Sequence, residues 1–192
     1  MPKFTFTSDT LPSELPVRVR ARMWADSMKA IGSSFEMGIV ASRKFRGEVS
    51  VLPLGGMQVG VATTVSDGPV TVMRTEEGFA RDNDNRLMIV INAGETPMQV
   101  SQFDRQVKLA PGDMSIVAVD IPSECWTPRS GRSFVVMFPR ELVERPGELI
   151  EQHSATRLTG DTSAQRLLTG QLKDLLSDDV TLDESIEAAA AD

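Results

Sequence analysis

The chain has 192 residues, of which 41% are hydrophobic and 24% are charged, a composition that fits one soluble globular domain and excludes collagen-like, coiled-coil and wholly disordered classes. Its single Cys and single His exclude a disulfide framework and a multi-histidine metal site. The net charge of −7 comes from residues 174–192, which hold seven acids and no Lys or Arg. Residues 1–173 hold 20 bases and 20 acids, so they lack the excess of basic side chains that nucleic-acid binding needs.

The N-terminal end predicts a helix and no targeting segment. Residues 1–5 lack the apolar core of a signal peptide, and no stretch approaches the roughly 20 apolar residues of a membrane span. With Cys125 unpaired, we expect a cytoplasmic location and no membrane partner. We expect residues 1–34 to form a helical segment that packs on the rest of the domain. Residues 16–31 carry its apolar stripe, which consists of Val17, Ala21, Trp24, Met28 and Ile31.

Residues 35–145 have the pattern of an all-β domain. Short apolar or alternating runs are separated at fairly even spacing by turn clusters, as in a sandwich or barrel. No helical pattern of about ten residues interrupts them, which argues against a doubly wound parallel sheet. Leu87 to Ile91 is continuously apolar, so we expect this strand to be covered on both sides. The predicted strands are 36–41, 48–54, 57–64, 69–75, 87–92, 98–103, 106–109, 114–119 and 133–138.

The C-terminal part of the chain returns to a helical period. Residues 139–143 predict a short helix or turn, and residues 164–177 predict a longer helix with a leucine-rich stripe. A third helix over 181–191 begins with a capping box and then stops two turns later at the end of the chain. We therefore expect residues 146–192 to be a linker and helical dimerisation segment of a protein that continues beyond Asp192.

The residues that usually carry catalysis or metal binding are not grouped in this sequence. His153 lies beyond the β region, so the His set of a metal-dependent cupin enzyme is missing. Cys125 has no His near it in the sequence, and a dyad with His153 would rest on two isolated residues. No phosphate-binding loop or nucleophile elbow occurs. We expect no catalytic residues, no metal and no cofactor, and interpret His153 as a surface or packing residue.

The order of motifs along the chain resembles one known family. A helix that bears Trp24 precedes Phe45-Arg46-Gly47 and strands around 49–62, and a leucine-rich helix follows the last strand. Between them come Val72-Met73-Arg74-Thr75, Leu87-Met88-Ile89-Val90-Ile91, Val100-Ser101-Gln102, Leu109-Ala110-Pro111-Gly112-Asp113 and Phe134-Val135-Val136-Met137-Phe138-Pro139. Over residues 5–180 this order resembles the sensor domain of AraC/XylS-type transcriptional regulators, in the group with a cupin-like N-terminal half.

The resemblance implies a fold and a function. The fold would be mainly β with flanking helices: a cupin-like jelly-roll barrel or sandwich, an N-terminal helix and C-terminal dimerisation helices. The chain would sense a small-molecule effector and form a homodimer, and DNA would be bound only through a C-terminal pair of helix-turn-helix units that this sequence lacks. Two other functions remain open, a small metal-independent cupin-like enzyme such as an isomerase or lyase, and a structural interaction module without a ligand.

A barrel of about eight strands can hold one small ligand in an apolar interior with a few polar groups. Arg74, Arg86 and Asn92 are candidate polar contacts, and an inward-pointing Arg would favour a carboxylate ligand. A register error of one residue would reverse the direction of every side chain in a strand. The candidate lining residues are Met73, Met88, Val90, Met114, Trp126 and Met137.

The leucine stripe of 164–177 predicts a dimer interface. Five leucines are more than a short surface helix leaves in water, and each is worth roughly 1.5–3 kcal/mol when buried, so a second copy of the chain is the expected cover. The alternative is that this helix packs back on its own barrel. The stripe consists of Leu167, Leu168, Leu172, Leu175 and Leu176.

Overall fold

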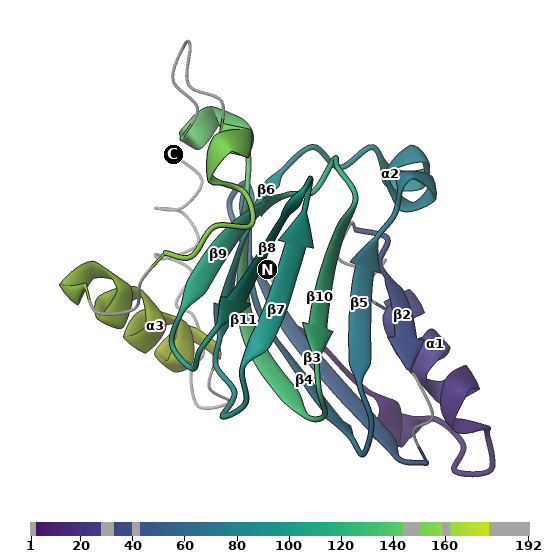
Figure 1. Cartoon of the computed structure of the whole chain (residues 1–192). Helices are drawn as coiled ribbons and strands as arrows, with labels where there is room; N and C mark the ends of the chain where they lie inside the picture. Colours follow the sequence, from purple (N-terminus) through teal and green to yellow (C-terminus); the bar gives the residue numbers. More distant parts are fainter. Residues whose placement is uncertain (1–2, 28–32, 40–42, 144–149, 159–161, 177–192) are drawn as a thin grey trace.

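The computed structural model describes residues 3–27, 33–39, 43–143, 150–158 and 162–176. Two antiparallel sheets face each other, and helices flank them (Figure 1). The six-stranded sheet has the order β1 (Phe4–Thr7), β3 (Phe45–Leu54), β4 (Met57–Ser66), β11 (Gly131–Phe138), β6 (Leu87–Asn92), β9 (Met114–Ala118). The five-stranded sheet has the order β2 (Glu36–Ile39), β5 (Val70–Arg74), β10 (Ser123–Thr127), β7 (Met98–Gln102), β8 (Arg105–Leu109).

Three α-helices and three short 3-10 helices complete the described chain. Helix α1 (Val17–Ser27) packs on β2 and β3, α2 (Glu76–Asp82) follows β5, and α3 (Ser163–Leu176) contacts β3 and β4 from the other side of the molecule (Figure 1). The 3-10 helices are η1 (Ser8–Thr10), η3 (Arg140–Leu142) and η4 (Ile150–His153). None of the described helices is long and apolar enough to cross a membrane.

Strand alternation places the core on both faces of the six-stranded sheet. In β11, Val135 pairs with Gly60 of β4 and with Val90 of β6, and these positions face the second sheet. The alternate residues Phe134 and Val136 face outward, into a second apolar cluster that includes Leu172 and Leu176 of α3. Since a strand covered on both sides needs apolar residues at every position, the continuous run of β6 is buried nearly throughout, as the sequence predicts.

The mainly β fold with two facing sheets confirms the predicted fold class, and all nine predicted strands occur, β6 with the predicted ends and the others with at least one end shifted. Two further strands, β1 and β10, were not predicted. The inward positions of β10 are Ser123, Cys125 and Thr127, which are small or polar, so this strand has no hydrophobic alternation for a pattern to detect. Helix α2 was also missed because its seven residues cover less than two turns. The predicted helix over 181–191 lies outside the described residues.

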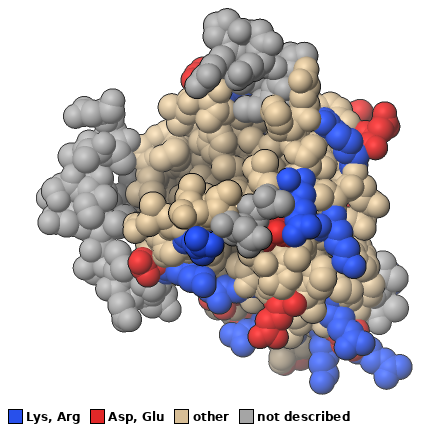
Figure 2. Space-filling view, turned by 60° about the vertical axis from the view of Figure 1, so that its left-hand side comes forward, with Lys and Arg blue, Asp and Glu red and all other residues tan. Residues whose placement is uncertain are grey.

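On the face viewed from the side of α3, the visible charged side chains include both signs, with Lys and Arg more prominent than Asp and Glu. Figure 2 shows that Lys and Arg gather with Asp and Glu on the lower part of this face, while the upper part is mostly uncharged. This mixture agrees with the equal numbers of bases and acids in residues 1–173.

Candidate functional site

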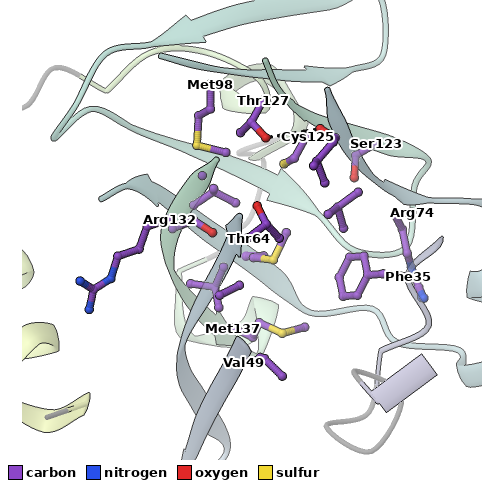
Figure 3. A pocket seen from close by; sticks show the side chains of 18 of the residues that line it. Phe35, Val49, Thr64, Arg74, Met98, Ser123, Cys125, Thr127, Arg132 and Met137 are labelled. Atoms are coloured by element: carbon purple, nitrogen blue, oxygen red, sulfur yellow. Dashed lines mark hydrogen bonds between the residues drawn. The ribbon is translucent and has the colours of Figure 1, made fainter. Parts of the chain in front are cut away.

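A partly open cavity of about 110 Å³ lies between the two sheets, and most of its wall is apolar (Figure 3). The inward-facing residues of β3, β4, β6 and β11 form one wall, and those of β5, β7 and β10 form the other. Trp24 and Phe35 complete the lining. The strand residues that line it are Val49, Val51, Ala62, Thr64, Val70, Val72, Arg74, Met88, Val90, Met98, Ser123, Cys125, Thr127, Gly131, Arg132, Ser133, Val135 and Met137.

Trp24 closes the cavity from the side of α1. Its side chain is only 1% exposed, and it meets the ring of Phe45 edge to face with 5.9 Å between the centroids. The indole also lies against Gly47, where an added Cβ would come within 2.7 Å of two indole carbons. Position 47 therefore has to be glycine for the helix to approach the sheet this closely.

The indole Nε1–H of Trp24 is buried and has no hydrogen-bond partner among the described residues. Most buried N–H groups in proteins are paired, so this donor is an exception within the packed region around α1. The other polar lining residues are the hydroxyl-bearing Thr64, Ser123, Thr127 and Ser133, the thiol-bearing Cys125, and the charged Arg74 and Arg132. Thr127 donates to the carbonyl oxygens of neighbouring strand and turn residues at 3.4 Å.

Cys125 also lines the cavity and is a neutral thiol. Burial raises its pKa to about 12, and the negative charge of Glu124 adds to the shift. The thiolate is the nucleophilic form of cysteine, so this environment makes Cys125 unreactive near neutral pH. Within the described residues no three His, Cys, Asp or Glu side chains gather to hold a metal ion, and His153 lies exposed at the end of η4.

Arg74 lines the cavity, but internal partners occupy its guanidinium. The Nε–H donates to the Val119 carbonyl oxygen at 2.7 Å, and Nη1 donates to the Ser34 carbonyl oxygen at 2.9 Å. Asp82 of α2 accepts two further bonds, from Nη1 at 2.7 Å and Nη2 at 2.5 Å. The expectation that an inward Arg needs a carboxylate ligand is corrected here, because the protein supplies that carboxylate itself.

The Asp82 carboxylate is held in its ionised form. Burial works against the charge, but the hydrogen bonds from Arg74 and from the backbone N–H groups of Asp84 and Ser34 outweigh it and hold the pKa of Asp82 well below its usual range. Helix α2 brings this carboxylate into place: the Thr75 hydroxyl caps its first turn by accepting from the Gly78 N–H at 3.1 Å, and Asn83 ends it in the left-handed conformation.

Of the nine candidate ligand contacts, the structure brings Arg74, Met88, Val90 and Met137 together in the cavity wall. Met73 alternates with Val72 and Arg74 and faces an outer groove beside Glu76 and Glu77. Trp126 alternates with Cys125 and Thr127 and lies on the outer face of the same sheet. Both residues had been assigned the wrong face of their strand, which is the reversal that a one-residue register error produces.

Arg86 and Asn92 lie elsewhere because their own neighbours use their polar atoms. Arg86 makes two bonds to the Asp84 carboxylate, at 2.9 and 2.7 Å, in the segment between α2 and β6. The Asn92 side chain donates to the carbonyl oxygens of Thr96 and Leu109, each at 3.0 Å, and thereby fixes the end of β6. Met114, the remaining candidate, packs in the apolar cluster under α3 rather than in the cavity.

The leucine stripe of α3 is largely used within the chain. Leu172 and Leu176 are buried, and the half-buried Leu168 packs on the same cluster against the outer face of the six-stranded sheet. Leu175 is half-buried, and only Leu167 is well exposed, at 65%. The premise that five leucines lie in water is therefore wrong, and the alternative that this helix packs on its own barrel describes most of the stripe.

Sequence reasoning missed the residues that form most of the cavity wall. Val49 and Val51 of β3, Val70 and Val72 of β5, and Ala62 of β4 alternate at the spacing of two that defines one strand face. That spacing was a usable signal, but it does not say which face of a strand is inside. Trp24 of α1 also belongs to the lining, and it packs in an apolar cluster with Ala21 and Phe45, as the predicted helix stripe requires.

The facing antiparallel sheets and the apolar cavity between them define a cupin-like jelly-roll sandwich. Residues 24–192 match the AraC-binding-like domain family, and the chain belongs to that family. The membership confirms the resemblance that the order of motifs suggests, and it makes the chain a ligand-sensing type of domain from transcription regulators.

Individual relatives agree with the family assignment. The transcriptional activator NphR from Rhodococcus sp. is 23% identical over 172 residues, which cover 88% of this chain and 50% of NphR, so the chain spans about half the length of this relative. The crystal structure of the AraC-like transcriptional activator CuxR superposes with a TM-score of 0.70 and 16% identity over 99% of this chain and 67% of that chain. At that identity the likeness to CuxR concerns the fold.

Proposed function

We propose that this chain is the effector-sensing and dimerisation part of an AraC-type transcription regulator that works in the cytoplasm, and that the effector binds in the cavity between the two sheets. The observation that carries the proposal is the apolar cavity between the sheets, which the inward faces of both sheets line in a member of the AraC-binding-like family. An interaction module without a ligand would have no need of an internal cavity, since cores otherwise pack to high density.

DNA binding is assigned to a separate part of the regulator. The charge balance of residues 1–173 supports this division, and so does the match to one half of NphR. A labelled DNA duplex mixed with this chain should therefore keep its fluorescence anisotropy unchanged at physiological salt. Salt-dependent binding of the duplex to the chain alone would contradict the division.

The proposed role does not include catalysis. Among the residues that the structure describes, the titratable side chains of the cavity wall are Arg74, Arg132 and Cys125. Proton transfer needs a group whose pKa lies near the working pH, and neither a guanidinium nor a thiol with a pKa of about 12 meets that condition. The enzyme alternative consequently has no acid–base pair to use in this cavity.

The role of the cavity can be tested by filling it. Ala62→Leu adds a branched side chain inside the cavity, while Val65→Leu adds volume at an exposed position of the same strand. A panel of small uncharged and anionic molecules, including cyclopentanone and butanoate, should contain members that raise the Tm of the wild-type chain and of Val65→Leu in a concentration-dependent way. Ala62→Leu should not respond. The proposal fails when no member of the panel stabilises the wild-type chain, or when Ala62→Leu responds equally.

A further inference from the structure

The described helices leave the outer face of the five-stranded sheet uncovered. Helix α1 contacts β2 and β3, and α3 packs on the outer face of the other sheet, while no described helix lies over β10 and β7 (Figure 1). The strand register brings five outward residues into one row at the end of this face nearest α2. In strand order, the row consists of Glu36, Met73, Glu124, Ser101 and Gln106.

The outer groove at this end of the face has apolar side chains that the rest of the protein does not cover. Met73 and Phe103 line it, and neither belongs to an apolar cluster of the described chain. Phe103 is 48% exposed, and in the turn between β7 and β8 its φ of 55° lies in the left-handed region that disfavours bulky residues. A ring at this position contributes little to the core, whereas aromatic side chains are common where proteins meet their partners.

The same groove is negatively charged. Glu76 and Glu77 at the start of α2 and Glu124 of β10 line it, and within the described residues no salt bridge or side-chain hydrogen bond engages their carboxylates. The guanidinium of Arg74 also belongs to the lining, but Asp82 neutralises it. Three like charges around one groove repel one another, and a cationic partner relieves this repulsion.

The charge of the groove selects its partner. A second copy of the chain would bring the same carboxylates together, and nucleic acid would bring phosphates, so like charges oppose both. A protein segment that carries Lys or Arg beside an apolar side chain fits, because its cations face the carboxylates and its apolar group covers Met73 and Phe103. Within the proposed function, the DNA-binding part of the regulator supplies such a segment, since phosphate contacts require Lys and Arg.

We propose that the outer groove docks a basic segment of the regulator's DNA-binding part. The inference rests on the proposed function, which assigns DNA binding to a separate part of the regulator. Because both parts belong to one polypeptide, the effective concentration of the segment is on the order of millimolar, so even a weak contact forms. Lys and Arg side chains held in the groove are withheld from DNA, and docking therefore lowers the affinity of the regulator for DNA.

Three synthetic hexapeptides with a fluorescein label test the chemistry of the groove on this chain. The first alternates basic residues with leucine, the second has serine in place of leucine, and the third has glutamate in place of the basic residues. Fluorescence anisotropy measures their affinities. We expect the first peptide to bind about fivefold more tightly than the second, the effect of one partly buried apolar side chain. The third should not bind, and added salt should weaken the binding of the first two.

Matched charge reversals locate the binding site. The double variant Glu77→Lys with Glu124→Lys should bind the leucine-containing basic peptide about tenfold more weakly, since two attractions become repulsions. The control is Glu48→Lys with Glu95→Lys, which changes the charge equally at exposed positions outside the groove and should leave the affinity within about twofold.

A second pair of variants tests the apolar part of the groove. Phe103→Asn should lower the affinity for the leucine-containing peptide about fivefold, and Asn tolerates the left-handed backbone at this position. Val65→Asn, also at a residue that is 48% exposed but on β4 of the other sheet, should not change the affinity. Circular dichroism and Tm establish that all four variants are folded.

In the whole regulator, release of the docked segment should strengthen DNA binding. The Glu77→Lys and Glu124→Lys double variant should bind a labelled duplex of mixed sequence about fivefold more tightly than the control double variant with the same net charge. Equal DNA affinity of the two variants overturns the DNA-binding part as the occupant. Peptide binding that survives the groove reversals, or preference for the acidic peptide, overturns the groove as a docking site for basic segments. None of these results depends on the cavity, so the small-molecule panel with Ala62→Leu decides the proposed function independently.

Discussion

Trp24 and Gly47 determine how closely the first helix approaches the six-stranded sheet. The buried residues of α1 are Ala21, Trp24 and Ala25, so small side chains on both sides of the indole let the helix backbone come near the strands. On the sheet, Gly47 leaves the space that the indole ring occupies, and Phe45 packs against the edge of that ring. The position of Trp24 beside the cavity therefore requires that residue 47 is glycine.

Replacing Gly47 with Ala should destabilise the protein. The new Cβ would lie 2.7 Å from indole carbons of Trp24 and 2.8 Å from the Phe45 ring, so both rings would have to move. Overpacking of this kind costs about 1–3 kcal/mol, measurable by urea unfolding. Gly170→Ala in α3 is the control, because its Cβ would meet nothing within 4 Å and Ala favours a helix. Equal stability of Gly47→Ala and wild type would show that the rings of Trp24 and Phe45 can move apart at no cost in free energy.

At the scale of elements, the Arg74–Asp82 ion pair connects α2 to the end of β5. The guanidinium is fully buried and the carboxylate is 15% exposed. The same guanidinium bonds the carbonyl oxygens of Ser34 before β2 and Val119 after β9, so four segments of the chain meet at one side chain. Gly78 is part of this junction, because an added Cβ there would lie 2.6 Å from the Ser34 carbonyl oxygen.

Asp82→Asn should destabilise the protein by about 3 kcal/mol at pH 7, since it leaves a buried guanidinium without its counter-charge. The pKa of Asp82 is lower in the folded than in the unfolded chain. Its stabilising contribution is therefore complete above the unfolded pKa of about 3.9 and is lost as the pH falls toward the folded value. The stability difference between wild type and Asp82→Asn should shrink between about pH 4 and pH 2. The exposed Glu77→Gln on the same helix is the control, and a difference that stays constant over this range would refute the assignment.

The leucines of helix α3 differ in burial, so their replacement should have different effects on stability. Leu172 is 2% exposed and packs in the cluster of Leu52, Val59 and Phe134, so Leu172→Ala should cost about 2–5 kcal/mol of unfolding free energy. The same truncation at the exposed Leu167 should change the unfolding free energy of the monomer by less than about 0.5 kcal/mol, measured at dilutions where the chain is monomeric. Thermal and urea unfolding of the two variants provide the comparison. Similar losses in both would mean that Leu167 is covered in the folded protein.

Strands with apolar alternation, such as β4 and β7, could be predicted from the sequence because their buried faces repeat every second residue. The strand β10 could not, since Ser123, Cys125 and Thr127 face a cavity rather than a packed core and need not be large or apolar. For the same reason the site was predicted only in part. Met88, Val90 and Met137 lie in strands whose apolar character is evident, whereas the direction of Met73 and Trp126 depends on register, which only the pairing with neighbouring strands fixes.

At the scale of the whole molecule, the apolar surface left on α3 bears on assembly. Leu167 is well exposed and Leu168 and Leu175 are half-buried, so the helix retains an apolar strip after it has packed on its own sheet. We propose that this strip contributes to the dimer. A two-fold arrangement would bring the same strip of two copies together and cover it, as symmetric homodimers do. This interface would be smaller than the one predicted from the sequence, in which all five leucines of the stripe take part.

Leu167→Glu should weaken the dimer without unfolding the protein. A carboxylate at the centre of a symmetric contact faces its own copy, so two like charges would oppose association, while an exposed position carries little folding energy. Light scattering over a dilution series should give a dimer for the wild-type chain and a monomer for the variant at equal concentration, with circular dichroism unchanged. Leu142→Glu, at an exposed leucine of η3, is the control and should remain dimeric. A Leu167→Glu variant that stays dimeric at every dilution would place the interface elsewhere on the molecule.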